Sequence, residues 1–116
     1  MKRFLAIYTG TPALMSKWNN LPEQEKESLQ SAGIAAWYAW VEKHKHSIIE
    51  NGTPLGRSKN VSASGIADIR NNMTAYTVVQ AESHEAAAKL FENHPHFTIF
   101  PGDGVEIMEC LPVPDL

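Results

Sequence analysis

Two histidines separated by a single residue, His94 and His96, are followed seven residues later by Asp103. Histidine has an ordinary pKa near 6.5, so a small shift in that pKa suits it to proton transfer at neutral pH. An extended segment would place both imidazoles on one side, with Cα atoms about 7 Å apart, where they could share a substrate. We therefore predict that His94, His96 and Asp103 are the catalytic candidates, with Asp103 orienting a histidine that acts as the base.

Each of these residues also has a structural interpretation. An Asp in a Pro-Gly-Asp-Gly turn commonly bonds to the turn backbone. His94 could cap the end of the preceding helix as an imidazolium, and His96 could fill space near Phe97. A metal site would need a third ligand, which the sequence does not fix, so we expect no metal.

A second group of residues could form the wall of a pocket. Trp37, Trp40 and His44 recur at helical spacing, and two indoles with an imidazole can line a flat pocket for an aromatic ligand. A histidine on an apolar helix face is also a common core residue. Arg57 lies in a segment with the composition of an edge strand, where its charge would protect the edge or receive an anionic group. Phe97 would either line the same pocket or plug the open end of the core.

Composition restricts the class of protein. The 116 residues are 43% hydrophobic and 20% charged, which predicts one globular domain over 1–116. A net charge of −3 argues against a nucleic-acid partner. A single cysteine, Cys110, excludes an internal disulfide. No apolar run approaches the roughly 20 residues of a membrane span. We expect a cytoplasmic protein without a cofactor.

Hydrophobic periodicity and turn residues predict the elements that would position these side chains. The predicted strands are residues 4–8, 53–61, 75–81 and 105–111. The predicted helices are a segment from Pro22 that pauses near Gly33, a second over 34–50, and a third that Ser83 caps and that ends at His94. Residues 62–72 are predicted to be a polar loop and 96–100 an extended segment.

The order of these elements is typical of an α+β, ferredoxin-like βαββαβ fold with a four-stranded antiparallel sheet. The first and third strands are central in that fold, and they are the most apolar here. The segment with Pro54 falls at an edge, where a residue without an amide proton is tolerated.

Both faces of the predicted sheet carry apolar side chains. The first strand has Phe4, Ala6 and Tyr8 on one face and Leu5 and Ile7 on the other. Helices can cover only one face, so we expect a homodimer in which a second copy covers the other. The alternative is that residues 11–22, which include three large apolar side chains, fold back over that face.

Four stretches follow one another in an order that resembles the YCII-related family: residues 52–59 (GTPLGRSK), 76–88 (YTVVQAESHEAAA), 94–97 (HPHF) and 104–107 (GVEI). The resemblance covers about residues 50–112. The related Asp-Gly-Pro-Phe signature is absent, and Gly65-Ile66-Ala67-Asp68 stands in its place. The resemblance implies a dimeric α/β barrel of two ferredoxin-like units and His/Asp acid–base chemistry of a lyase or isomerase kind.

Three functions remain open from the sequence. The first is a cofactor-free enzyme acting on a small molecule, such as an aromatic one, by histidine-mediated proton transfer. The second is a binding or regulatory module that holds a small molecule without turnover. The third, by fold analogy only, is a cofactor-independent oxygenase. In each case we expect the site near residues 94–103.

Overall fold

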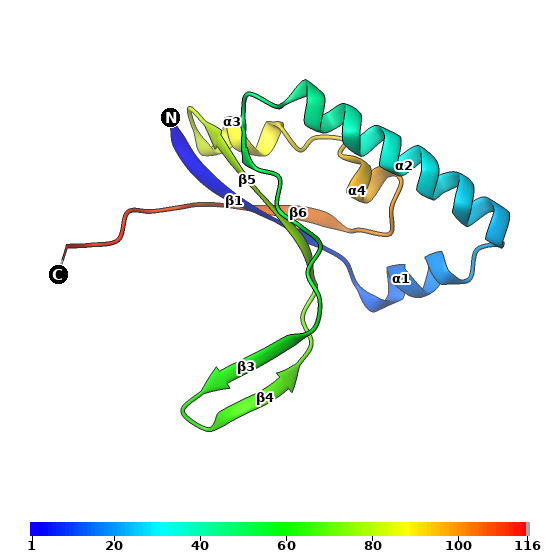
Figure 1. The fold of residues 1–116 in the computed structure, drawn as a ribbon, viewed down its shortest axis with the longest axis horizontal. Helices are drawn as coiled ribbons and strands as arrows, with labels where there is room; N and C mark the ends of the chain where they lie inside the picture. Colours follow the sequence, from blue (N-terminus) through cyan, green and yellow to red (C-terminus); the bar gives the residue numbers. More distant parts are fainter. Residues whose placement is uncertain (116) are drawn as a thin grey trace.

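The computed structural model describes residues 1–115, and Figure 1 shows their arrangement. Its elements are, in chain order, β1 (Lys2–Thr9), α1 (Pro12–Asn19), α2 (Glu23–Lys43), β2 (Ile48–Glu50), β3 (Ser58–Ser62), β4 (Gly65–Ile69), β5 (Met73–Ala81), α3 (His84–Lys89), α4 (Pro95–Thr98) and β6 (Gly104–Glu109). Four strands form an antiparallel sheet in the order β2-β5-β1-β6, and β3 pairs with β4 in a separate hairpin. The predicted α+β class and ferredoxin-like strand order are confirmed.

The central strands β1 and β5 divide their side chains between two faces. Phe4 lies opposite Val79 and Ala6 opposite Thr77, and all four are buried on the face that the helices cover. Leu5 and Ile7 point to the other face. Figure 1 shows α2, α3 and α4 on one side of β1, β5 and β6, so within this chain the second face stays uncovered by those helices.

Helix α2 runs without interruption through Gly33, where we predicted a pause. A Cβ atom at position 33 would overlap the ring of Phe100, so glycine here permits close packing against the segment after α4. The helix ends at Lys43, earlier than the predicted Glu50, and His44 is its C-cap. Residues 48–50 are the edge strand β2 instead, because the ladder with β5 satisfies their backbone groups.

Residues 12–19 form helix α1, which the sequence analysis did not assign. The hydroxyl of Thr11 caps it by accepting from the amide of Leu14, and Pro12 occupies the first turn. Trp18 packs against Phe100, with ring centroids 5.9 Å apart. Among the described residues, α1 has no extensive contact with a strand of the sheet, so this segment does not cover the second face as the alternative required.

The predicted edge strand over 53–61 is wrong in its position. Pro54 contributes only an isolated bridge to Ala75, since it has no amide proton to extend the ladder. The chain then leaves the sheet, and the predicted loop over 62–72 contains the second strand of the β3–β4 hairpin. Gly65, with φ +108°, closes the tight turn between these two strands.

The C-terminal third follows the prediction more closely. The Ser83 hydroxyl accepts from the amide of Ala86 and caps α3, as predicted. The helix ends at Lys89, earlier than the predicted end at His94. Residues 96–100, predicted to be extended, begin in the short helix α4. No helix among residues 1–115 combines the length and apolarity needed to cross a bilayer.

Candidate functional site

The two histidines of the predicted pair are set by the turn between α3 and α4. Asn93 adopts a left-handed conformation with φ 58°, which Asn tolerates better than most residues. His94 is extended, as the residue before a proline prefers to be, and Pro95 begins α4. His94 therefore caps the start of α4, in contrast to the predicted cap at the end of the preceding helix.

His94 lies at the centre of an aromatic cluster. Its ring is fully buried, with centroid distances of 4.5 Å to Trp37, 4.6 Å to Trp40 and 5.1 Å to Tyr8. Its Nδ1 accepts a hydrogen bond from the backbone amide of His96 at 3.0 Å. Among residues 1–115, its Nε2 is the one buried side-chain nitrogen or oxygen without a partner.

Burial fixes the charge of His94. Desolvation, reinforced by the nearby His96 and His44, lowers its pKa to about 3. The ring is therefore neutral at pH 7, with Nδ1 as the acceptor and the proton on Nε2. A buried neutral imidazole of this kind orders the core and the start of α4, and it is poorly suited to exchange protons with a ligand.

His96 has a different environment. Its Nε2 lies 2.7 Å from the carbonyl oxygen of Thr9, and because a carbonyl can only accept, Nε2 carries the proton. Burial is the largest influence and lowers the pKa of His96, while the Thr9 carbonyl and Asp103 act in the opposite direction. At neutral pH the ring therefore presents an unprotonated Nδ1. Within residues 1–115 this Nδ1 has no protein partner and is not sealed from solvent.

Gly102 holds the ring of His96 in place from behind. A Cβ atom at position 102 would overlap the imidazole, so only glycine allows this approach. The amide of Gly102 also donates to the carbonyl oxygen of His96 at 3.0 Å. The residues around His96 thus fix both its position and its tautomer, as a general base requires.

Asp103 contacts Thr9 and not a histidine. The Thr9 hydroxyl donates to the Asp103 carboxylate at 2.5 Å, and the Asp103 amide donates to the Thr9 carbonyl at 3.0 Å. Thr9 thereby connects Asp103 to His96 through one carbonyl oxygen. The carboxylate acts on His96 through its charge, and its hydrogen bond is to Thr9 and not to the histidine that we predicted it would orient.

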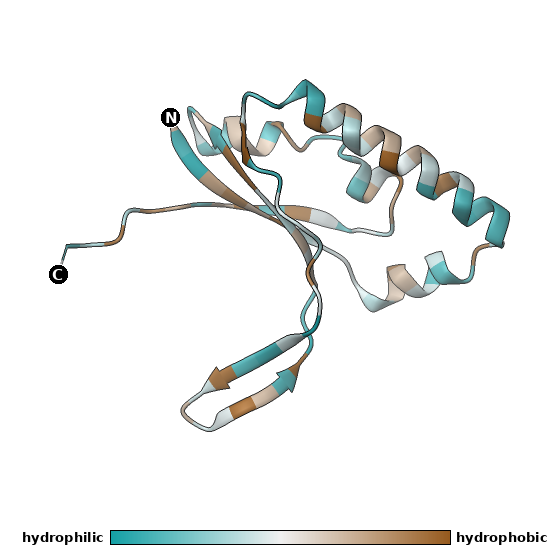
Figure 2. Cartoon of the chain, in the orientation of Figure 1, coloured by the Kyte–Doolittle hydropathy of each residue, from teal (hydrophilic) through white to brown (hydrophobic). Residues whose placement is uncertain are grey.

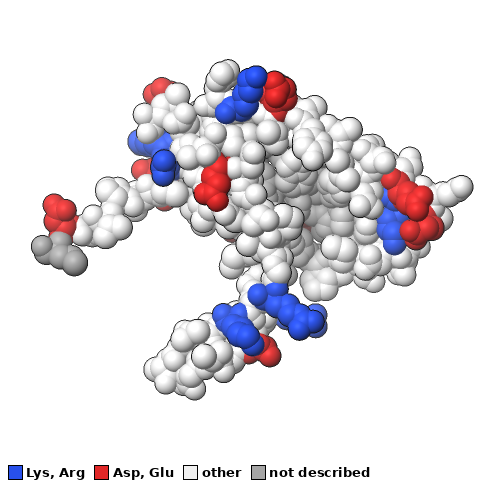
Figure 3. Space-filling view, viewed as in Figure 1, with Lys and Arg blue, Asp and Glu red and all other residues white. Residues whose placement is uncertain are grey.

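His96, which is 8% exposed, is one of the residues that line a large open cleft of about 1630 Å³. Helix α1, the segments on either side of the β3–β4 hairpin and the turn at 100–102 form the rest of the wall. Three cationic residues line it: Arg57, Lys59 and Arg70. Lys59 is paired with Asp68 at 2.6 Å, which leaves two arginines without a carboxylate partner among the ion pairs of residues 1–115. Figure 3 shows this group of basic side chains where the hairpin joins the body.

The predicted site residues thus separate into two places. His96 and Arg57 both line the cleft, whereas Trp37 and Trp40 surround His94 in the core. The indole nitrogen of Trp40 donates to the carbonyl oxygen of Leu90 at 2.8 Å.

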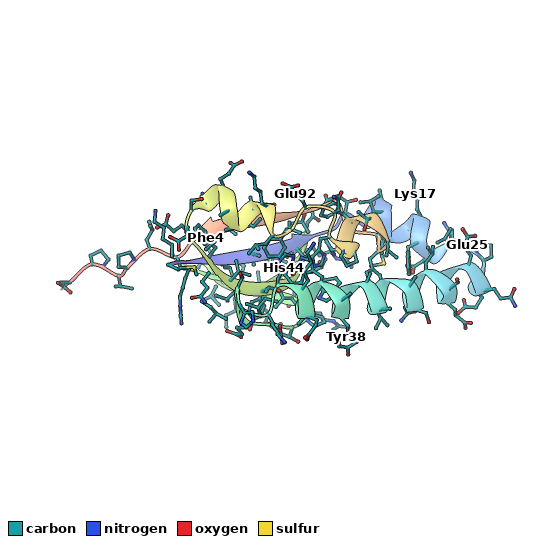
Figure 4. All side chains as sticks on the ribbon, turned by 90° about the horizontal axis from the view of Figure 1, so that it is seen from above. Phe4, Lys17, Glu25, Tyr38, His44 and Glu92 are labelled. Carbon is teal, nitrogen blue, oxygen red and sulfur yellow. The ribbon has the colours of Figure 1, made fainter. Side chains whose placement is uncertain are left out.

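His44 and Phe97 lie outside the wall of the cleft. The ring of His44 is 5.3 Å from that of Trp40, and burial, followed by the charge of Lys43, lowers its pKa. Figure 4 shows His44 at the end of α2 beside the sheet. Phe97 is 37% exposed.

Three contributors to the site were missed from the sequence: Thr9, Gly102 and Arg70. Thr9 lies 87 positions from His96, and no local pattern indicates that its carbonyl would receive a histidine. Arg70 follows β4, and only the recognition of a hairpin would have placed it beside Arg57. Within residues 1–115, no three His, Cys, Asp or Glu side chains are grouped as metal ligands.

The sequence matches no protein-family model and no curated protein. Among solved structures, it is similar in fold to 5-chloro-2-hydroxyhydroquinone dehydrochlorinase (TftG) from Burkholderia phenoliruptrix AC1100, solved in complex with 2,5-dihydroxybenzoquinone. The TM-score is 0.51 at 19% identity, over 91% of this chain and 90% of that chain. At this identity the likeness shows a shared fold.

Proposed function

We propose that this protein is a YCII-related enzyme in which His96 removes a proton from a small, planar, acidic molecule bound in the cleft. The proposal rests on the protonation and the hydrogen bonding of His96. Its Nε2 donates to the Thr9 carbonyl, its unprotonated Nδ1 has no hydrogen-bond partner among residues 1–115, and His96 is one of the residues that line a cleft. This is the arrangement that a histidine base needs before substrate arrives.

The chemistry follows from the groups at the cleft. Nδ1 of His96 takes a proton from a saturated carbon next to a carbonyl, and the electron pair of the broken C–H bond moves onto the carbonyl oxygen. The resulting imidazolium is favoured by the Thr9 carbonyl and by the negative charge of Asp103. Arg57 and Arg70 stabilise the enolate oxygen. Return of the proton elsewhere gives an isomerase, and departure of a leaving group gives a lyase; neither route requires a cofactor.

The charge of the cleft supports an anionic substrate class. Hydroxyquinones are vinylogous acids and are anions at neutral pH. The structurally similar dehydrochlorinase was solved with such a molecule, 2,5-dihydroxybenzoquinone. Two arginines that have no carboxylate partner among residues 1–115 are well suited to hold oxygens at the edge of a planar anion.

We further propose that the functional form is a cytoplasmic homodimer. The sheet face opposite the helices presents Leu5, Ile7 and Val78, with Met108 beside Leu5 in the register of β1 and β6. The YCII resemblance predicts that two such faces meet in a dimeric α/β barrel. This pairing would remove the apolar face from water.

A binding module without turnover is the second candidate. The observation that favours it is the engagement of Asp103 with the Thr9 hydroxyl, which leaves no carboxylate bonded directly to a histidine. In this case the cleft would bind the anion through its arginines, and His96 would contribute only a hydrogen bond.

One experiment separates these functions. The protein is mixed with 2,5-dihydroxybenzoquinone in D₂O, binding is measured by calorimetry, and exchange of the ring-carbon hydrogens is followed by NMR. The exchange passes through the keto tautomer, in which the ring carbon has gained a deuteron from solvent and His96 removes the proton. We expect binding and faster exchange with the wild type. With His96→Gln, whose amide can still donate to Thr9, we expect binding without faster exchange.

His46→Gln provides the matched control, because His46 is an exposed histidine outside the cleft. It should behave as the wild type does. Binding without acceleration by the wild type would instead establish the binding module, and no binding at all would contradict both functions.

A further inference from the structure

The β3–β4 hairpin, residues 58–69, stands away from the rest of the chain as an arm. Every residue from Lys59 to Ile69 is exposed. The extensive contacts of β3 and β4 are with each other alone. A two-stranded hairpin on its own is marginally stable in water, so the arm needs a surface to lie against.

The arm exposes apolar side chains of the kind that form a contact surface. Val61 and Ile66 are directly opposite each other in the register, next to the turn, and each is 73% exposed. Figure 2 shows these apolar positions on the two strands, in the part of the arm farthest from the body. The Lys59–Asp68 pair lies on the same face of the hairpin, two residues nearer the body.

The arm projects toward the uncovered face of the sheet. In Figure 1, the helices α2, α3 and α4 lie on one side of the sheet and the arm extends on the other. That second side is the one to which Leu5, Ile7 and Val78 point. The arm and the uncovered face therefore border the same concave side of the molecule.

Charge indicates what the arm lies against. Residues 57–70 contain three basic residues and one acidic residue, a net charge of +2. The remaining residues contain seven basic and twelve acidic residues, a net charge of −5. The arm itself, residues 58–69, contains one Lys and one Asp, so the positive charge lies at its base, on Arg57 and Arg70. This basic base and the acidic remainder of a second copy attract each other, and electrostatic complementarity of this kind steers association.

From these observations we infer that the arm of one protomer lies along the second protomer and packs Val61 and Ile66 against it. The inference rests on the proposed homodimer and adds a contact beyond the sheet face. It also explains the size of the cleft. A volume of about 1630 Å³ exceeds the roughly 300–1,000 Å³ of most small-molecule pockets. Since the arm carries cleft residues at its base, docking of the arm fixes Arg57 and Arg70 and completes the site.

Hydrogen–deuterium exchange and sedimentation test this arrangement in the full chain. In the wild-type dimer, amides of residues 58–69 should exchange slowly. In an Ile7→Asp variant, which charges the sheet face, the same amides should exchange as fast as those of an unfolded segment. The double variant Val61→Ser/Ile66→Ser should raise the dimer dissociation constant about tenfold or more, since it removes two apolar contacts per arm.

Tyr38→Ser is the matched control for the arm variant. Tyr38 is also 73% exposed and lies on α2, so its removal should leave the dimer unchanged. Figure 4 shows Tyr38 pointing away from the sheet.

The outcomes distinguish failure of the arm contact from failure of the proposed dimer. The inference would be overturned if the wild type is a dimer whose arm exchanges freely and the Val61→Ser/Ile66→Ser variant has the wild-type dissociation constant. The proposed dimer would then still stand. A monomeric wild type would overturn both. Protection of the arm only after addition of a single-stranded oligonucleotide would overturn it in favour of a polyanion partner.

Discussion

The Nε2 atom of His96 and the carbonyl oxygen of Thr9 lie 2.7 Å apart and join helix α4 to the end of β1. This one hydrogen bond decides which nitrogen of His96 can accept a proton. The carbonyl of Thr9 also accepts from the amide of Asp103, so the end of β1 holds together the two segments that form the inner wall of the cleft.

The buried His94 should make the protein sensitive to acid. Its folded-state pKa of about 3 is below the unfolded value near 6.5, so its stabilising contribution is complete above pH 6.5 and is lost as the pH falls. From pH 7 to pH 5, protonation of the unfolded chain at this residue should lower the free energy of unfolding by about 2 kcal/mol. Urea denaturation at each pH measures it.

The His94→Asn variant isolates this contribution. Asn also caps helix starts well but does not titrate. The variant should lose less stability between pH 7 and pH 5 than the wild type, whatever its absolute stability. Equal losses in the two proteins would show that His94 does not remain neutral in the fold.

Addition of one methyl group at Gly102 should displace His96. Gly102→Ala places a Cβ on the imidazole ring, and overpacking of this kind typically lowers the free energy of unfolding by about 1–3 kcal/mol. Gly56→Ala is the matched control, since a Cβ there meets no atom within 4 Å. It should be neutral or stabilising by up to about 1 kcal/mol. Thermal denaturation measures the stability of both variants. Equal changes in the two would contradict the close approach of Gly102 to the His96 ring.

The uncovered sheet face should be the main dimer contact. Ile7→Asp introduces a charge among Leu5, Val78 and the facing copy, and it should produce a folded monomer at about 50 µM, a concentration at which an obligate dimer stays associated. Light scattering reports the mass and circular dichroism the fold. Tyr38→Asp, on the far side of α2, should remain dimeric. A wild type that is itself monomeric at this concentration would refute the dimer.

The arginines of the cleft should determine anion affinity. Arg57→Gln should weaken binding of 2,5-dihydroxybenzoquinone by about tenfold, because a hydrogen bond to a charged group contributes about 1.5–3 kcal/mol when well formed. Binding by the wild type should also weaken as salt is raised. Lys89→Gln, at the end of α3, should have no effect in the same calorimetric titration. An unchanged affinity in the Arg57 variant would place the anion elsewhere.

The sequence predicts the sheet well because packing and local propensity favour the same structure in its central strands. Residues 4–8 and 75–81 are apolar on both faces and rich in β-branched and aromatic side chains, so tertiary packing and local propensity agree. The Ser83 cap could also be predicted, because it depends on residues that are close in sequence. The edge strand was misplaced because β2 contains only three residues, and its pairing with Val79 and Val78 depends on a long-range contact.

The candidate site was predictable only in part. His96 and Arg57 line the cleft and were chosen from residue type, which did not separate His96 from the buried His94. The role of His94 was not evident, because its aromatic surroundings come from β1, α2 and the end of α3. Thr9 and Gly102 contribute a carbonyl oxygen and the absence of a side chain, and neither has a sequence pattern of its own.

The tautomer of His96 provides the most direct test of the proposed base. Long-range ¹H–¹⁵N correlation NMR at pH 7 distinguishes a protonated ring nitrogen from an unprotonated one. We predict a protonated Nε2, an unprotonated Nδ1, and a shift of the Nδ1 resonance when 2,5-dihydroxybenzoquinone is added. A ring protonated on Nδ1, or an Nδ1 resonance that does not move at saturating ligand, would contradict the assignment of His96 as the base.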